Sequence, residues 1–230
     1  MNNEENKKNN KAKKEKKEKG NFGYIDSFKK RQGIIGFISL LMVFVIYFTG
    51  IIIYGHNKSL FTVMAAVSML PTAKYLVMFF VVAKFKSGTK EVFDALIPFC
   101  NNKKWLYVND DTLLEITPEE QVSPEDGKAT MIADLILTYG DHIMNVDYII
   151  INRGHVFAYS DYPKLDVEYT KDYIKKILEN TCNFKSYKFY TDKDQFVKEV
   201  LNNIHTNTDC NKKVITNDYI IARKILPYSI

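Results

Sequence analysis

The 230-residue sequence has few of the residues from which common active-site motifs are built. Its four histidines and three cysteines form no C-x-x-C, Cys/His or H-E-x-x-H spacing, and no glycine-rich phosphate loop or G-x-S-x-G turn occurs. The sequence therefore argues against the enzyme classes that these motifs define and predicts no resident cofactor. The cysteines are dispersed and odd in number, which favours reduced thiols in a cytoplasmic domain; they are Cys100, Cys182 and Cys210.

Acidic residues are absent from residues 32–85. Within this stretch, Gly33 to Tyr54 has no charged side chain, and these 22 residues form about 33 Å of helix, enough to cross a hydrocarbon core of about 30 Å. A second apolar run, Leu60 to Phe85, follows a short polar break. The first run is too long, and starts too late, for a cleavable signal peptide. We therefore predict a transmembrane hairpin of two helices over residues 31–86.

Basic residues flank the outer ends of the two apolar runs, whereas the connecting loop carries only Lys58 and His56. The flanking residues are Lys29, Lys30, Arg31, Lys84, Lys86 and Lys90. Because lysine and arginine are retained on the cytoplasmic side of a bilayer, this pattern predicts a multi-pass protein of the cell membrane with both termini in the cytoplasm.

One charged residue, Lys74, lies inside the second apolar run, three residues after Pro71. The proline removes one helical hydrogen bond and leaves a carbonyl near Val67 that the Lys74 ammonium or the Thr72 hydroxyl can meet. An ionisable residue at this depth is a candidate functional site. The structural alternative is that Lys74 snorkels or is neutral between packed helices. A transport or sensing site would require a homo-oligomer of hairpins, since two helices alone make a poor pathway.

The chain before the hairpin is almost entirely Asn, Lys and Glu over residues 1–20, a composition that cannot bury enough apolar surface to fold. We predict a disordered basic tail over residues 1–30. Its lysines favour contact with anionic lipid of the bilayer, and the interspersed glutamates weaken that contact. Residues 86–230 contain 18 basic and 22 acidic side chains, a balance that disfavours a broad nucleic-acid-binding surface.

Hydrophobic periodicity divides the rest of the chain into helices and strands. Four helices are predicted: Thr89–Cys100, Thr170–Thr181 with Thr170 as its cap, a helix that begins at the capping box Asp192–Gln195, and Asp218–Leu226. Four strands are predicted: Ala129–Tyr139, Asn145–Ile151, His155–Ser160 and Tyr187–Tyr190. The three residues Asn152 to Gly154 connect the second strand to the third. Trp105–Val108 and Leu113–Ile116 are ambiguous short strands. We expect one cytosolic α/β domain over residues 87–206 and a C-terminal extension over residues 207–230.

The order helix, three strands, helix, strand, helix resembles the restriction-endonuclease-like core, and most of all the nuclease-related domain of that superfamily. The residues that carry the resemblance are Gly88, Glu91 and Asp147-Tyr-Ile-Ile-Ile-Asn-Arg-Gly-His-Val-Phe157. The resemblance implies a mixed sheet of αβββαβ order, with Asp147 as the metal-binding acid of its second strand. In that family an acid-x-Lys on the next strand completes a site where Mg²⁺ or Mn²⁺ activates water against phosphate.

The sequence departs from the family pattern on that next strand. Counting from Asp147, the expected acid and lysine fall on Ser160 and Tyr162. A nuclease or phosphodiesterase would need nearby substitutes, and its candidate residues are Asp147, Glu91, Asp161 and Lys164. The alternative function is therefore a divalent-metal-dependent enzyme, with nucleic acid as its substrate.

From Lys30 onward the chain also resembles a family of small two-span membrane proteins of Clostridia-type bacteria, often labelled O-linked GlcNAc transferase-like. The likeness rests on three segments: Leu70-Pro-Thr-Ala-Lys74, Asp134-Leu-Ile-Leu-Thr138 and Val146-Asp-Tyr-Ile-Ile150. The label implies helical repeats of about 34 residues and a large donor-binding domain. Neither fits after the hairpin. We therefore predict a membrane-anchored cytosolic interaction module without catalytic activity, whose partner is an unknown protein.

Overall fold

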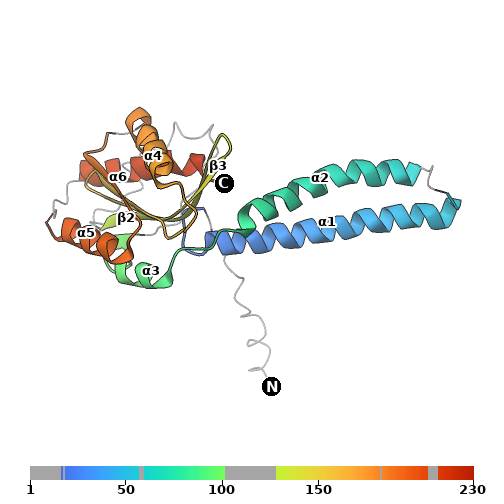
Figure 1. Cartoon of the computed structure of the whole chain (residues 1–230), viewed down its shortest axis with the longest axis horizontal. Coiled ribbons are helices and arrows are strands. Elements are labelled where there is room, and N and C mark those ends of the chain that lie inside the picture. The colour runs from blue at the N-terminus through green and yellow to red at the C-terminus, as the bar shows by residue number, and fades with distance from the viewer. Residues whose placement is uncertain (1–16, 18, 57–59, 102–127, 182, 207–211) are drawn as a thin grey trace, which may run out of the picture.

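The computed structural model describes residues 17, 19–56, 60–101, 128–181, 183–206 and 212–230. Most of the predicted tail, the two ambiguous strands after residue 104, and the cysteines at positions 182 and 210 lie outside the described residues. The described chain consists of a long helical hairpin and an α/β domain at the hairpin's base (Figure 1).

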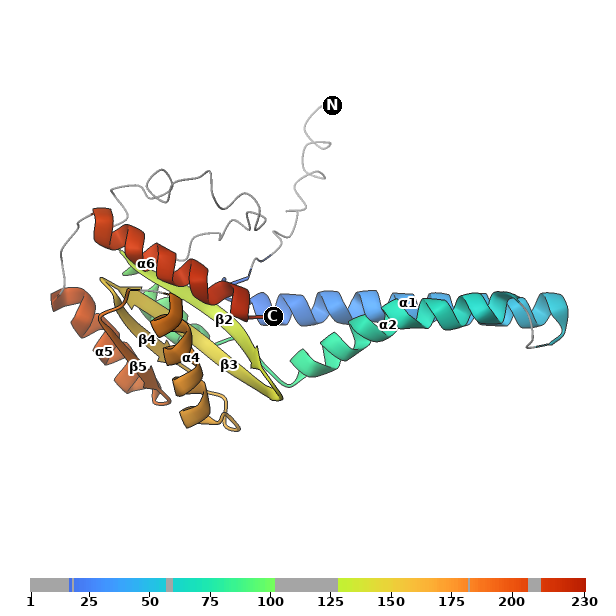
Figure 2. The same ribbon diagram turned by 90° about the horizontal axis from the view of Figure 1, so that it is seen from above.

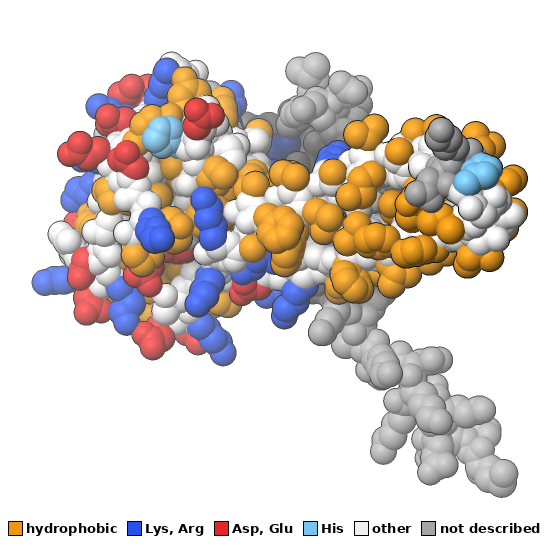
Figure 3. Space-filling model, turned by 45° about the vertical axis from the view of Figure 1, so that its right-hand side comes forward, with side chains coloured by type: hydrophobic (Ala, Val, Ile, Leu, Met, Phe, Trp, Pro, Cys, Tyr) orange, Lys and Arg blue, Asp and Glu red, His pale blue; other side chains and the backbone are white. Residues whose placement is uncertain are grey.

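The hairpin is formed by α1 (Tyr24–Tyr54) and α2 (Leu60–Ala83), which lie side by side and antiparallel (Figures 1 and 2). The prediction of a disordered tail up to residue 30 was wrong at its end, since α1 begins at Tyr24. Both helices are long and apolar enough to cross a membrane. They pack closely because glycines face large side chains: a Cβ added at Gly33 or Gly36 would stand 3.0 Å from Phe79 or Leu76, respectively. The outer surface of the hairpin is a coat of exposed apolar side chains (Figure 3).

A mixed five-stranded sheet follows, and its strands are neighbours in chain order. They are β1 (Cys100–Asn101), β2 (Ala129–Tyr139), β3 (His142–Asn152), β4 (His155–Tyr159) and β5 (Ser186–Tyr190). The central strand β3 is antiparallel to both β2 and β4, and each edge strand runs parallel to its neighbour. The mixed sheet with covering helices agrees with the predicted fold class, and β2 has the predicted bounds.

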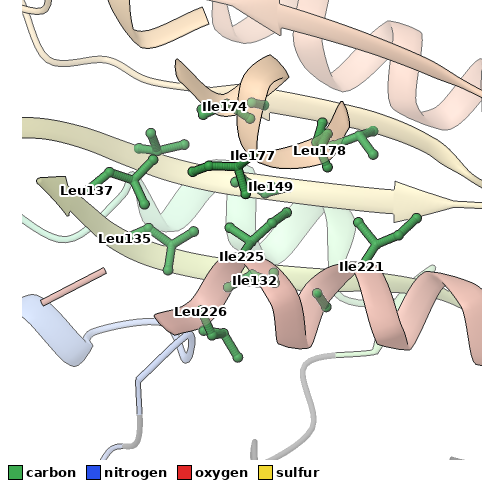
Figure 4. Packing of buried hydrophobic residues seen from close by; sticks show 14 of the residues in the cluster. Ile132, Leu135, Leu137, Ile149, Ile174, Ile177, Leu178, Ile221, Ile225 and Leu226 are labelled. Atoms are coloured by element: carbon green, nitrogen blue, oxygen red, sulfur yellow. The ribbon is translucent and has the colours of Figure 1, made fainter. Parts of the chain in front are cut away.

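Two layers of helices cover the sheet. One face is covered by α4 (Val167–Thr181) and α6 (Lys212–Ile225), which turns into the short 3₁₀ helix η3 (Leu226–Tyr228). Isoleucines and leucines from both helices point toward the strands (Figure 4). The other face is covered by α3 (Lys90–Leu96) and α5 (Lys193–Thr206). The C-terminal segment, predicted as an extension, thus packs into the core of the domain through Ile221, Ile225 and Leu226.

Several predicted element ends were wrong, each for a local reason. The first domain helix ends at Leu96 rather than Cys100, because Pro98 disfavours further helix and Cys100 pairs in β1. The next predicted cap, Thr170, lies inside α4: the cap is Asp166, whose carboxylate accepts the Tyr169 N–H at 3.0 Å. The cap predicted at Asp192 is confirmed by its bond from the Gln195 N–H at 2.7 Å.

The connection between β3 and β4 is a two-residue turn rather than the predicted three. Asn152 pairs with His155 inside the ladder, and Arg153 and Gly154 have φ angles of 54° and 80°. Two successive residues of positive φ are typical of the tight hairpin turn that matches strand twist. The Asp218 carboxylate of α6 accepts the N–H groups of both turn residues at 2.6 Å, which holds the non-glycine residue in this conformation.

Candidate functional site

The centre of the candidate site is an irregularity shared by β2 and β3. The paired residues are Ala133 with Tyr148 and Leu135 with Val146, and between them Asp134 stands opposite Asp147. Asp134 has a φ of 56°, unusual for a residue other than glycine. This distortion changes which residues face the α4/α6 layer, from even-numbered to odd-numbered positions along β2. Two carboxylates are thereby placed side by side in the interior of the sheet.

Asp134 binds both ends of the hairpin that enter the domain. Its carboxylate accepts the Gly88 N–H, just after α2, at 2.9 Å, and the Ile25 N–H, in the first turn of α1, at 3.4 Å. The Gly23 N–H and the Ser87 side chain also lower the pKa of this carboxyl, against the effect of its burial. The first N–H groups of a helix have no partner within the helix and attract negative charge. Asp134 therefore fastens the start of α1 and the exit of α2 to the same point of the sheet.

Apolar side chains pack around the hydrogen bonds that Asp134 accepts. Ile25, Val82, Phe85 and Ile136 form a buried cluster between the hairpin base and the sheet. The Phe85 ring meets the Tyr162 ring edge-on, with centroids 5.1 Å apart. The hairpin and the domain thus share a core at the junction, and are not joined by a free linker.

The segment that leaves α2 is pressed against Tyr148 of β3. A Cβ added at Gly88 would stand 2.8 Å from the Tyr148 ring, and the Tyr148 hydroxyl donates to the Thr89 carbonyl at 2.8 Å. No residue larger than glycine fits here without displacement of the tyrosine. This packing explains why the structure has a glycine at position 88.

Asp147 is buried with both carboxylate oxygens engaged by the chain itself. One accepts the Asp161 N–H at 2.6 Å and the other the Asn145 side-chain amide at 2.8 Å. Burial raises its pKa to about 6, an effect increased by the nearby carboxylates of Asp134 and Asp161 and opposed by the two donors. Asp147, in the middle of β3, therefore acts as an acceptor at the end of the β3–β4 ladder, one residue beyond the pair Tyr148–Tyr159.

The two positions where the nuclease family carries its second acid and lysine have other contacts here. The Ser160 hydroxyl is buried and donates to the Asn145 carbonyl at 2.7 Å. Tyr162 supplies the ring that packs on Phe85, as described above, and its N–H donates to the Ser160 hydroxyl oxygen at 3.3 Å. Both positions thus help hold the junction together.

The remaining predicted site residues do not converge on Asp147. Glu91 is exposed on α3 and forms an ion pair with Lys193 of α5 at 2.7 Å. Lys164 is exposed in the segment before α4, and Asp161 approaches Asp147 through its backbone N–H while its side chain is exposed. Within the described ranges, no hydrogen bond or ion pair joins Glu91 or Lys164 to Asp147, and no group of three potential ligands is placed to hold a metal ion.

In the hairpin, Lys74 and Pro71 both lie on the outer surface of α2. The buried Thr72 hydroxyl donates at 2.9 Å to the carbonyl of Ser68, the residue after Val67. Lys74 faces outward and is not enclosed between α1 and α2, which removes the interpretation of a lysine packed between these two helices.

Two buried carboxylates, those of Asp134 and Asp218, were not predicted from the sequence. Burial raises the pKa of both groups, to about 6 for Asp218. Asp134 is the one acid inside an otherwise apolar strand, and Asp218 lies three residues before the buried Ile221, on the same face of its helix. A carboxylate in such a position is the signal that could have drawn attention to them. Comparisons of the chain with family models, curated proteins and solved structures gave no match.

Proposed function

We propose that this protein is a membrane-anchored module whose cytosolic α/β domain binds a protein partner and does not catalyse a reaction. The observation that carries the proposal is the engagement of Asp147: both its oxygens accept donors of the fold at 2.6 and 2.8 Å. A metal-dependent nuclease needs those oxygens for the ion. In this protein both oxygens accept hydrogen bonds from Asn145 and Asp161 beside the junction of hairpin and domain.

The location is supported by the two long apolar helices and by basic residues at their domain-side ends. We place the protein in the cell membrane with both termini and the domain in the cytoplasm, following the distribution of lysine and arginine. The N-terminal tail then lies on the same side as the anionic lipid headgroups, which its lysines attract.

The junction contributes to this function by fixing the orientation of the domain relative to the bilayer. The carboxylate of Asp134, the apolar cluster around Phe85 and the C-terminus all restrain the same region, since the Ile230 N–H donates to the Ile136 carbonyl at 2.9 Å. A partner would therefore meet one constant face of the domain. Such restraint favours a scaffold or docking role over a tethered enzyme that must reach its substrate.

The alternative is a divalent-metal-dependent nuclease or phosphodiesterase. It is supported by the three antiparallel strands followed by a helix and a parallel strand, and by the raised pKa of Asp147. It would use Mg²⁺ or Mn²⁺ held by Asp147 with Asp161, and nucleic acid as substrate.

The test is cleavage of labelled single- and double-stranded DNA and RNA by the full chain in lipid nanodiscs, with Mg²⁺ or Mn²⁺, beside Asp147→Asn. We expect no cleavage by either protein. Cleavage by the wild type that is lost in a folded Asp147→Asn variant would replace the proposal by the alternative. The amide keeps the size of the side chain, so loss of folding is a smaller concern than with alanine.

A further inference from the structure

The outward face of α2 carries a regular apolar stripe that contains one lysine. The spacing of four, three, four and three residues places Val63, Val67, Leu70, Lys74 and Val77 on one face of the helix. The four apolar members are 59%, 61%, 73% and 60% exposed in chain order, whereas the opposite face of α2 packs on α1 through residues such as Leu76. This stripe is one of the exposed faces of the hairpin.

Lys74 lies deep within the span. Lys84, the residue after the domain end of α2, lies ten positions further along the chain, which corresponds to about 15 Å of helix, or half of a hydrocarbon core of about 30 Å. The nearest headgroups are therefore further away than its four-carbon stem reaches. A lysine at this depth is costly in lipid and requires a polar partner.

The chain itself does not supply that partner. Residues 32–85 contain no aspartate or glutamate, and among the described residues Lys74 has no hydrogen bond or ion pair. A second copy would bring another lysine to the same depth and no carboxylate. Self-association through this stripe would thus place like charges together, which disfavours a homo-oligomer at this face.

We propose that the stripe of Val63, Val67, Leu70, Lys74 and Val77 docks a transmembrane helix of a different protein that carries an aspartate or glutamate at the depth of Lys74. Branched apolar residues at this spacing pack against a second helix, and the acid neutralises the lysine within the bilayer. The inference rests on the membrane insertion proposed above and identifies the class of partner.

The experiment is site-specific photo-crosslinking in membranes of the source cells, with a benzophenone amino acid in place of Leu70 or Val77, and in place of the exposed Phe44 of α1 as a control. Crosslinked segments are identified by mass spectrometry. We expect Leu70 and Val77, but not Phe44, to crosslink to a membrane-spanning segment that contains an acid. The crosslink should fall at least tenfold in Lys74→Leu, persist in Lys74→Arg, and fall equally when the partner's acid is replaced by leucine.

Three outcomes would overturn the inference: crosslinks to lipid alone, crosslinks to a second copy of this chain, or a protein crosslink that Lys74→Leu leaves unchanged. Alkaline carbonate extraction of the same membranes separates this failure from failure of the proposed function. Release of the protein into the supernatant would refute membrane insertion itself. Retention in the pellet without an acid-bearing partner would refute only the docking of such a helix.

Discussion

Replacement of Asp134 by alanine should loosen the hairpin from the domain before it unfolds either part. Asp134 is 1% exposed and accepts the Gly88 and Ile25 N–H groups at 2.9 and 3.4 Å. Each buried donor left without an acceptor costs about 1–3 kcal/mol, with the longer bond at the lower end. Alanine must also adopt the φ of 56°, a conformation that aspartate tolerates better than alanine does.

Part of this cost is offset, because the substitution also removes a carboxylate whose charged form is disfavoured by burial. The same burial raises the pKa of Asp134. We therefore expect a net loss of about 3 kcal/mol in the free energy of unfolding, measured by chemical denaturation in detergent. The matched control is Asp141→Ala in the exposed turn of the same β-hairpin, which should leave the stability unchanged.

The location of the effect can be measured with pairs of spin labels. One pair joins the exposed position Lys30 of α1 to Lys198 of α5, and the other joins Lys175 of α4 to Lys198 within the domain. In Asp134→Ala we expect a broader distance distribution for the first pair and an unchanged one for the second. If the distance distributions of both pairs broadened equally, or neither broadened, the result would refute the role of Asp134 in holding the hairpin to the domain.

Three further predictions concern the same junction. Gly88→Ala should lower the free energy of unfolding by about 1–3 kcal/mol in denaturant titrations, because the added Cβ overpacks the Tyr148 ring at 2.8 Å; unchanged stability would contradict this packing. Asp147→Asn should flatten the pH dependence of stability between about pH 4 and pH 6 in thermal melts. Since the folded-state pKa of Asp147 is raised to about 6 from 3.8, its protonated form favours folding, and the wild type should lose that contribution as the pH rises through this range. If the stability of Asp147→Asn changed with pH as steeply as that of the wild type, the result would argue against burial of the Asp147 carboxyl. Tyr162→Ala should increase proteolysis at the junction, because it removes the ring that packs on Phe85, while Tyr162→Phe should behave as the wild type; resistance equal to that of the wild type would show that the ring contact is dispensable.

Local patterns in the sequence predicted most of the elements correctly. The apolar run from Ala129 to Tyr139 gave the bounds of β2, and the Asp192 cap located the start of α5, because both depend on neighbours within a few residues. The length of each apolar run likewise predicted the two helices of the hairpin. Such signals need no knowledge of distant contacts.

The candidate site could not be predicted in this way, because its contacts join residues far apart in the chain. Asp134 is 109 positions from Ile25 and 46 from Gly88, and no periodicity shows that these N–H groups meet one carboxylate. The sequence did identify Ser160 and Tyr162 as departures from the nuclease pattern. Only the structure shows that they bind Asn145 and Phe85 instead.

The most direct test of the account is hydrogen exchange of the full chain in nanodiscs, with and without saturating Mg²⁺ or Mn²⁺. The Asp161 N–H donates to Asp147 at 2.6 Å, so it reports whether that carboxylate is free for a metal ion. We expect slow exchange at Asp161 that neither ion changes. Faster exchange on addition of metal, abolished in Asp147→Asn, would mean that Asp147 leaves its place in the sheet to bind the ion, and would contradict the assignment of this region as a structural junction.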